Sequence, residues 1–373
     1  MNSLRVRHQG VLFASAIAFV VVVVDVAGSA LADEIPLAIY GDIDAIYKND
    51  NVNTESFSSP RIELFYSNNW DKLSFLSEIM FEAGEDNTYV LDVERVQLAY
   101  VFAEWLRVAA GRFHTAMGYY NDAYHHGYYF VLPAERPTAV DFEDAGGLIP
   151  AHSVGVHFDG HIRLNPNAVF RYDTDIANGR GAPGEVTIAF ARKQMKALNL
   201  RLRLELGTTL DDVVLGGNLY TDEIPANTGD PITGADRIPF AMREIIAGAH
   251  MAYLGRQVHL VSEYSWIQHS EKDGGQNSYS TQYLFGELGY TLAGEWTPYA
   301  RYEYTHFGSN PDPFYAFNAA ARGSYHRGTI GLNYLASEHL VFKLEFSLQH
   351  FGDAIAAGAR DVYTTTSQCA YAF

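Results

Sequence analysis

Residues 111–130, GRFHTAMGYYNDAYHHGYYF, place side chains that bind metals or move protons beside a dense group of aromatic rings. His114, His125 and His126 offer imidazole nitrogens, and Asp122 offers a carboxylate. Imidazole and carboxylate together suit zinc or copper. However, adjacent histidines in an extended segment point apart, and this stretch has no H-x-x-x-H or H-E-x-x-H spacing. A metal site is therefore an alternative that the spacing does not favour, and we expect no metal.

Catalysis would need a nucleophile, a base and an orienting group within reach of one another. Ser153 follows His152 directly, and adjacent residues of a strand face opposite sides of the sheet. These two side chains therefore cannot form a hydrogen-bonded dyad on one surface. We expect no enzyme activity and no cofactor, although an enzyme or a metal-binding surface protein remains the alternative from another class.

The N-terminal segment indicates export. Arg5 and Arg7 precede an apolar run over residues 11–24, and Ala30-Leu31-Ala32 supplies the small-x-small pattern of a cleavage site. The run is shorter than the roughly 20 residues that a membrane-spanning helix needs. The sequence thus predicts a signal peptide over residues 1–32 and a single unit over residues 33–373, because no linker or composition shift divides the rest.

The composition excludes several classes of protein. The net charge of −18 argues against nucleic acid as a partner. Cys369 is the single cysteine, so an internal disulfide framework and a thiolate metal cluster are both excluded.

Alternation of apolar and polar residues recurs along the chain and predicts strands. In LNLRLRLEL (198–206), the leucines face one way while Asn199, Arg201, Arg203 and Glu205 face the other. LVFKLEFSLQ (340–349) repeats the pattern. A soluble sandwich would bury the apolar face, whereas a membrane barrel turns that face to lipid and its polar face to the lumen.

The spacing of the turns favours the barrel. Short turns are expected at residues 68–72, 103–105, 159–161, 195–198, 254–256, 293–295 and 336–339. Longer connections rich in Gly, Asp and Asn are expected at residues 48–57, 82–88, 112–150, 174–184, 209–236, 269–278, 307–323 and 352–361. This rhythm of short turns and long outer loops predicts an all-β transmembrane antiparallel barrel of sixteen strands. Trp70, Trp105 and Trp296 flank short turns, as an interfacial aromatic girdle requires.

The last residues, TTTSQCAYAF, alternate up to a terminal aromatic side chain. Tyr371 and Phe373 share one face, and this ending resembles the C-terminal assembly signal of bacterial outer-membrane barrels. The resemblance implies the outer membrane, and therefore its lipid, as the location.

The connection at residues 112–150 is the third long one and the longest. It resembles the third loop of 16-stranded bacterial porins, which implies that it folds into the lumen. LRVAAGRFHTAMGYYN and RPTAVDFEDAGGLIP resemble a segment of phosphate-selective-porin-like proteins, although Ala116 stands where that family has proline and lysine is scarce in the loop. The porin resemblance also implies a homotrimer.

Two groups of side chains follow from this reading. The predicted pore constriction comprises Arg112, His114, Tyr119, Asp122, His125, His126, Arg136, Asp141, Glu143 and Asp144. The predicted basic wall of the lumen comprises Arg61, Arg95, Arg107, Arg171, Arg201, Arg203, Arg301 and Lys343. An acidic loop facing this wall across a narrow opening would give a strong transverse field.

The expected function is a water-filled channel for passive diffusion of small hydrophilic solutes and ions. The alternative is a channel specific for an oxyanion such as phosphate or for a small organic solute. The acidic loop tilts the expected preference weakly toward cations, whereas a channel dominated by the basic wall would pass anions. Because histidine titrates near pH 6.5, His114, His125 and His126 would weaken a cation preference between about pH 7 and pH 5.

Overall fold

The computed structural model describes residues 36–49, 54–58, 60–83, 89–124, 127–142, 146–181, 196–207, 211–226, 240–272, 276–308, 312–315, 323–352 and 360–373. Its strands are β1 (Leu37–Lys48), β2 (Thr54–Phe57), β3 (Arg61–Trp70), β4 (Leu73–Ala83), β5 (Tyr89–Ala103), β6 (Leu106–His114), β7 (His152–Asn165), β8 (Ala168–Ala177), β9 (Ala197–Gly207), β10 (Asp211–Ile224), β11 (Met242–Gly255), β12 (Val258–Glu271), β13 (Ser278–Tyr290), β14 (Trp296–Phe307), β15 (Tyr325–Ser337), β16 (Leu340–Phe351) and β17 (Asp361–Ala372). Among the described residues, no helix is both long and apolar enough to cross a membrane. The residues of the predicted signal peptide, 1–32, lie outside the described part.

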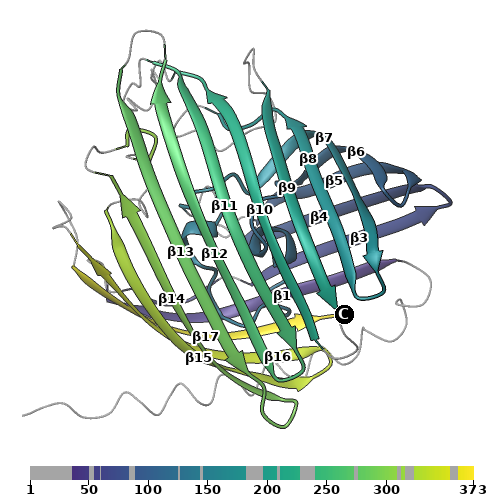
Figure 1. Ribbon diagram of the computed structural model, residues 1–373. Helices are drawn as coiled ribbons and strands as arrows, with labels where there is room; N and C mark the ends of the chain where they lie inside the picture. The colour runs from purple at the N-terminus through teal and green to yellow at the C-terminus, as the bar shows by residue number, and fades with distance from the viewer. Residues whose placement is uncertain are drawn as a thin grey trace, which may run out of the picture.

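The strands form one closed antiparallel barrel (Figure 1). Each strand pairs with its neighbours in sequence, and β1 closes the ring by pairing with β17 from Tyr40 opposite Ala372 to Lys48 opposite Thr364. The sheet contains seventeen segments, but β2 and β3 pair one after the other with the same edge of β1. They are therefore one barrel strand in two pieces, and the predicted sixteen-stranded barrel is confirmed.

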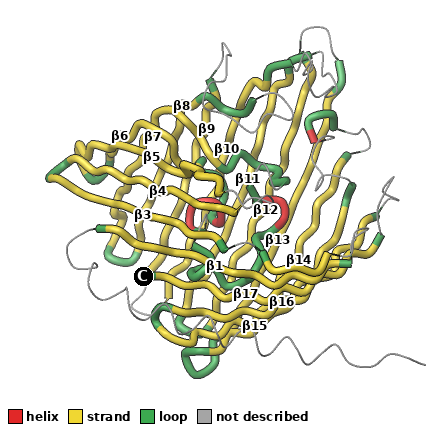
Figure 2. Tube along the Cα trace, turned by 180° about the vertical axis from the view of Figure 1, so that it is seen from behind, coloured by secondary structure: helices red, strands yellow, loops and turns green. Residues whose placement is uncertain are grey.

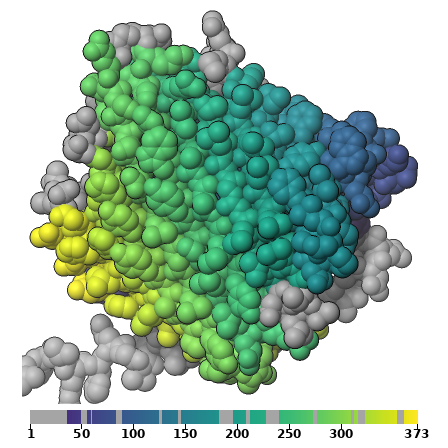
Figure 3. Space-filling model, viewed as in Figure 1, coloured from purple at the N-terminus to yellow at the C-terminus, as the bar shows by residue number. Residues whose placement is uncertain are grey.

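The barrel is apolar outside and charged inside. On β9, Leu200 and Leu202 are each 42% exposed on the outer face, whereas Arg201 between them is 1% exposed. On β16, Leu344 is exposed while its neighbours Lys343 and Glu345 are buried. This is the reverse of a soluble sandwich and matches the alternation of a membrane barrel. Figure 3 shows the outer face over β9–β14 as an unbroken wall of side chains.

Short turns and long connections alternate as predicted, but two turns lie elsewhere. Residues 159–161 lie within β7, and the turn falls at 166–167 instead. Proline at position 166 explains this, since it cannot donate to a ladder and suits a turn.

The second correction concerns β9 and β10. Ala197 and Leu198 of the turn expected at residues 195–198 begin β9, and the long loop expected at 209–236 contains β10. The paired aspartates and Gly216-Gly217 of DDVVLGGNLYTDEI suggested a loop. The segment nevertheless pairs along its length with both β9 and β11, which supply the backbone partners.

The tryptophan positions agree with an interfacial girdle at the end of the barrel with the short turns. Trp70 ends β3, Trp105 lies in the turn after β5, and Trp296 begins β14. All three are at least 40% exposed.

Candidate functional site in the barrel lumen

The long segment between β6 and β7 lies inside the ring of strands. It carries the short helix α1 (Tyr120–Ala123) and the 3-10 helix η3 (Thr138–Val140). Figure 2 shows helical turns within the barrel, enclosed by the wall. Because β6 continues to His114, the loop begins at Thr115, and the predicted constriction residues Arg112 and His114 are strand residues instead. We call residues 115–151 the lumen loop.

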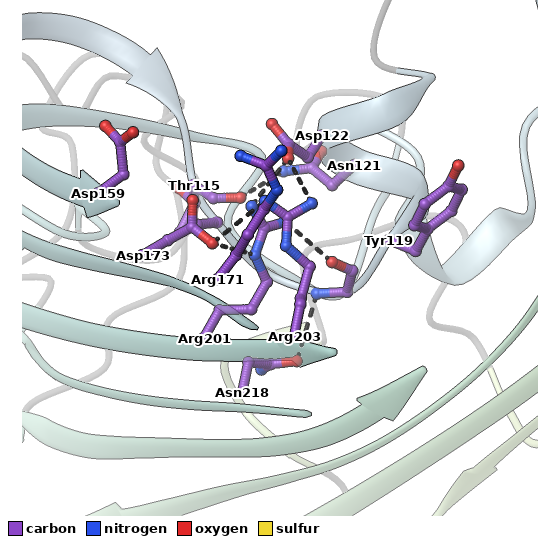
Figure 4. A network of polar contacts seen from close by, with 12 residues as sticks. Thr115, Tyr119, Asn121, Asp122, Asp159, Arg171, Asp173, Arg201, Arg203 and Asn218 are labelled. Atoms are coloured by element: carbon purple, nitrogen blue, oxygen red, sulfur yellow. Dashed lines mark hydrogen bonds and ion pairs between the residues drawn. The ribbon is translucent and has the colours of Figure 1, made fainter. Parts of the chain in front are cut away.

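One end of the lumen loop is held by strands β9, β10 and β12. Figure 4 shows the side chains of Arg201 on β9 and Asn218 on β10 that take part. Arg201 donates to Asp122 Oδ2 over 2.8 Å and to the Gly118 carbonyl over 3.1 Å. The backbone N–H groups of Tyr119 and Tyr120 both donate to Glu263 Oε1, over 2.7 and 2.5 Å. Partial removal from water would raise the pKa of Asp122, whose side chain is still 39% exposed, but the guanidinium groups of Arg201 and Arg203 lower it well below its usual range. This carboxylate therefore stays ionised.

The turn at Gly118 requires a residue without a side chain. Its φ is +65°, which L side chains rarely adopt, and a Cβ atom would lie 2.2 Å from Glu263 Oε2. The Glu263 carboxylate also accepts hydrogen bonds from the backbone N–H groups of Tyr119 and Tyr120 at the start of α1. The close contact between Gly118 and Glu263 is therefore part of the attachment.

A second attachment lies on β14, β15 and β17. Glu135 forms an ion pair with Arg327 and accepts a hydrogen bond of 2.8 Å from Thr366 Oγ1. Arg301 donates to the Glu135 carbonyl over 2.8 Å. Burial opposes ionisation of Glu135, yet Arg327 outweighs it and the pKa of this carboxyl is lowered. Arg327 was absent from the predicted wall, although it occupies an inward position of the alternating stretch YHRGTI.

The backbone between the two attachments is bound as well. Lys343 donates to the carbonyls of Tyr128 and Pro133, the latter over 2.8 Å. The hydroxyl of Tyr129 donates over 2.7 Å to the carbonyl of Glu338, which lies in the short turn between β15 and β16. The lumen loop therefore extends from the end of the barrel with the long connections to the end with the short turns.

The aromatic rings of the lumen loop pack against the wall. Tyr120 is fully buried, and its ring meets Phe285 of β13 edge-on at 5.8 Å between centroids. The buried apolar cluster joins loop residues to wall residues: Met117, Tyr119, Tyr120, Val131, Ala139, Val140, Leu148 and Ile149 with Tyr220, Ile246, Val261, Ile267, Tyr283 and Phe285 among others. The barrel thus has a packed core, which the loop supplies.

The described histidines at the two ends of the lumen loop have separate surroundings. His114 and His152 lie side by side, with ring centroids 5.5 Å apart, each near a carboxylate of its own. His125 and His126 lie outside the described residues, as do Glu143 and Asp144. Within the described ranges, no group of three or more His, Cys, Asp or Glu residues is arranged to hold a metal ion. Ser153 contacts Thr115 at 2.8 Å between hydroxyl oxygens.

The predicted basic wall is paired with carboxylates rather than set against them across an opening. Arg61 pairs with Asp42, Arg95 with Glu78, Arg107 with Asp159, Arg171 with Glu205, and Arg201 and Arg203 with Asp122 and Asp173. Arg301 and Lys343 are buried beneath the lumen loop. Arg136 turns back into the loop and donates to the carbonyls of Tyr124 and Val140, with Asp141 at 3.9 Å. Among the described residues, these arginines therefore have carboxylate partners in direct contact, and the predicted constriction residues Glu143 and Asp144 lie outside the described part.

Exposure of the charged side chains differs around the barrel. On the β14–β16 side, Arg301 and Glu345 have side chains that are at most 2% exposed. On the β6–β9 side, the side chains of Arg107, Asp122 and Arg171 are 35%, 39% and 40% exposed. Of the paired charges compared here, those on the β6–β9 side are therefore the more accessible to water.

No protein-family model and no curated protein matches this chain. Solved bacterial outer-membrane proteins do share its fold. The outer-membrane channel DcaP of Acinetobacter baumannii has a TM-score of 0.58 at 10% identity, over 91% of this chain and 97% of the other. The anion-selective porin from Comamonas acidovorans has a TM-score of 0.57 at 10% identity, over 91% and 99%. A trimer form of the outer-membrane protein OmpT of Vibrio cholerae has a TM-score of 0.55 at 12% identity, over 90% and 99%. These structural neighbours are porins and related barrels, and they do not confirm the resemblance to phosphate-selective-porin-like proteins.

Proposed function

We propose that this chain is an outer-membrane porin that lets small hydrophilic solutes and ions diffuse through its lumen. The observation that supports this most directly is the inverted barrel, with leucines exposed on the outer face and ionised groups inside. Such a surface is stable only against lipid, and a charged lumen is suited to water and polar solutes. The fold shared with porins supports the same proposal.

Single-channel recording in planar bilayers tests the proposal. We expect discrete conductance steps in KCl from the folded, heat-modifiable barrel, and uptake of small neutral sugars by liposomes that contain it. A correctly folded barrel that gives neither result would contradict the channel function and leave a non-channel role.

The lumen loop is proposed to be the element that narrows the channel. It contacts β9, β10 and β12 at one attachment and β14, β15 and β17 at the other, so it crosses the lumen. We expect deletion of residues 119–144 to raise single-channel conductance severalfold. Unchanged conductance in a heat-modifiable deletion variant would mean that the loop does not limit flow.

We further propose general diffusion rather than a channel specific for phosphate. Along the described lumen the arginines pair with carboxylates, and such pairing leaves little excess positive field to concentrate phosphate. The homotrimer, and export with removal of residues 1–32, belong to the same proposal. Cross-linking of the protein in outer-membrane fractions and N-terminal sequencing of the mature chain test these two points.

A further inference from the structure

A row of inward-facing residues crosses the wall from β8 to β11. Arg171 lies opposite Arg203, Arg203 opposite Gly216, and Gly216 opposite His250. Gly216 has no side chain, and the His250 ring lies over this position, since a Cβ atom on Gly216 would be 2.3 Å from His250 Nε2. Figure 4 shows Arg171 and Arg203 side by side near Asp122 of the lumen loop. Two guanidinium groups placed directly opposite each other repel unless negative groups lie close by.

This row has more hydrogen-bond donors than acceptors. The side chain of Arg203 makes no hydrogen bond to the described residues, and its buried Nε atom has no partner. Its nearest carboxylate oxygens belong to Asp173 at 3.4 Å and Asp122 at 3.6 Å. His250 is only 5% exposed, and neither of its ring nitrogens has a partner. Buried donors without acceptors are unfavourable. The side chain of Arg203 is 16% exposed, so a ligand group that accepts hydrogen bonds from the accessible part of its guanidinium group would be stabilised here.

Carboxylates beside these arginines are also accessible to solvent. The side chain of Asp122 is 39% exposed and that of Glu205 is 29% exposed, next to Arg171 at 40%. A simple anion would be repelled by the two carboxylates, and a simple cation by the two guanidinium groups. A molecule that carries both charges meets a complementary group for each of them.

We propose that Arg171, Arg203 and Asp122 form a binding subsite for a small zwitterion, in the class of the α-amino acids. The solute's carboxylate accepts hydrogen bonds from Arg203 and Arg171, and its ammonium group donates to Asp122. Because Arg203 Nη1 and Asp122 Oδ2 are only 3.6 Å apart, the two charges of the solute must be close neighbours, as they are in an α-amino acid. The inference rests on the proposed channel function, which gives solutes access to the lumen.

The test uses glycine as the zwitterion, with acetate and methylammonium as probes that each carry one of its two charges. In planar bilayers at pH 7 in KCl, we expect glycine to lower the conductance of the wild-type channel saturably. Acetate and methylammonium should need at least about tenfold higher concentrations, because each forms only one set of charge-assisted hydrogen bonds. Arg203→Gln should raise the half-effective glycine concentration about tenfold, and Arg203→Lys should restore it only in part because the ammonium group of lysine cannot bind in bidentate fashion.

Arg360→Gln is the matched control, because it removes the same charge from an exposed residue that donates only to backbone carbonyls at the end of β16. It should leave the glycine response unchanged. Thermal unfolding of the detergent-folded barrel gives a second readout, since a bound solute raises the melting temperature without any need for conductance.

Equal effects of acetate and glycine would replace the proposal by an anion site, and equal effects of methylammonium and glycine by a cation site. A channel that conducts but ignores glycine in both assays would overturn the inference and leave the proposed function standing. A barrel that is stabilised by glycine but does not conduct would overturn the proposed function alone.

Discussion

At the scale of single residues, two acidic side chains of the lumen loop decide where the loop is held. Asp122 lies 2.8 Å from Arg201 on β9, and Glu135 pairs with Arg327 on β15. The neighbouring guanidinium groups lower the pKa of both carboxyls, so both attachments persist at neutral pH. A carboxyl whose pKa is lowered by folding stabilises the folded state above its ordinary pKa, and loses that effect as pH falls through the lowered value.

Replacing Glu135 by Gln tests the second attachment. We expect the free energy of unfolding to fall by about 2 kcal/mol, because a charge-assisted hydrogen bond is lost and Arg327 keeps a buried charge. Conductance should rise as this part of the lumen loop detaches. Denaturant unfolding in detergent and single-channel recording measure the two effects. Glu338→Gln is the control, because the side chain of Glu338 is 87% exposed, and equal effects of both variants would refute the assignment.

Asp141 gives the lumen loop a group that titrates near neutral pH. Removal from bulk water raises the pKa of its carboxyl to about 6, although Arg136 opposes the shift. This side chain therefore loses its negative charge as pH falls from about 7 to about 5, and we expect the cation preference to weaken over that range. Reversal potentials in a KCl gradient measure this change. Asp141→Asn should abolish this pH dependence. If the pH dependence persists in Asp141→Asn but is lost when His114, His125 and His126 are replaced by Gln, the histidines rather than Asp141 are responsible.

At the scale of elements, the lumen loop depends on how β6 ends and α1 begins. The chain leaves β6 at His114, turns at Gly118 and docks the first N–H groups of α1 on Glu263 of β12. The turn is both left-handed and in close contact with the wall, so the position of the whole helix depends on one residue without a side chain.

Comparing Gly118→Ala with a control variant separates the effect of the positive φ from the effect of the close contact with Glu263. The added methyl group would meet the Glu263 carboxylate at 2.2 Å, so we expect a lower melting temperature and a raised or unstable conductance. Gly294→Ala is the matched control. Gly294 also has a positive φ, of +79°, but a Cβ atom there meets nothing within 4 Å. Should both variants behave alike, backbone strain alone would explain the effect and the contact with Glu263 would be unimportant.

At the scale of the whole molecule, closure of the barrel depends on the last residues of the chain. Phe373 exchanges two backbone hydrogen bonds of 2.8 Å with Ile39 at the start of β1. Its ring stacks on His339 in the turn between β15 and β16, with centroids 5.3 Å apart. The final aromatic residue therefore joins the first strand, the last strand and a short turn.

Phe373→Ser should lower the amount of heat-modifiable barrel in outer-membrane fractions, because the ring loses its contact with His339 and no longer fixes the end of the chain that pairs with β1. The yield can be measured by gel mobility with and without heating. Tyr363→Ser is the control, since Tyr363 lies near the other end of β17, the strand that Phe373 follows, and is 40% exposed. An unchanged yield for Phe373→Ser would argue against a terminal assembly signal.

The alternation of apolar and polar residues along each strand was enough to predict the barrel, because one face of every strand meets lipid and the other faces the lumen. The alternation of Leu198, Leu200 and Leu202 with Asn199 and Arg201 shows which side meets lipid without any knowledge of the neighbouring strands. The number of strands and the Trp-flanked short turns followed in the same way. Positions of turns were less certain, since the glycines and aspartates of β10 resemble a loop until β9 and β11 supply hydrogen-bond partners.

The docking of the lumen loop was decided by the tertiary structure. Asp122 and Arg201 are 79 positions apart in the chain, and Glu135 and Arg327 are 192 apart. The sequence around Asp122 or Glu135 does not indicate which arginine each will pair with. Such an ion pair depends on which distant strands the closed barrel brings close to the loop. For the same reason, the sequence predicted an acidic loop facing a basic wall across an opening, whereas in the described part of the folded protein Asp122 and Glu135 pair directly with Arg201 and Arg327. Strand alternation is a local property of the chain, and the pairing of charges across the lumen exists only once the barrel has closed.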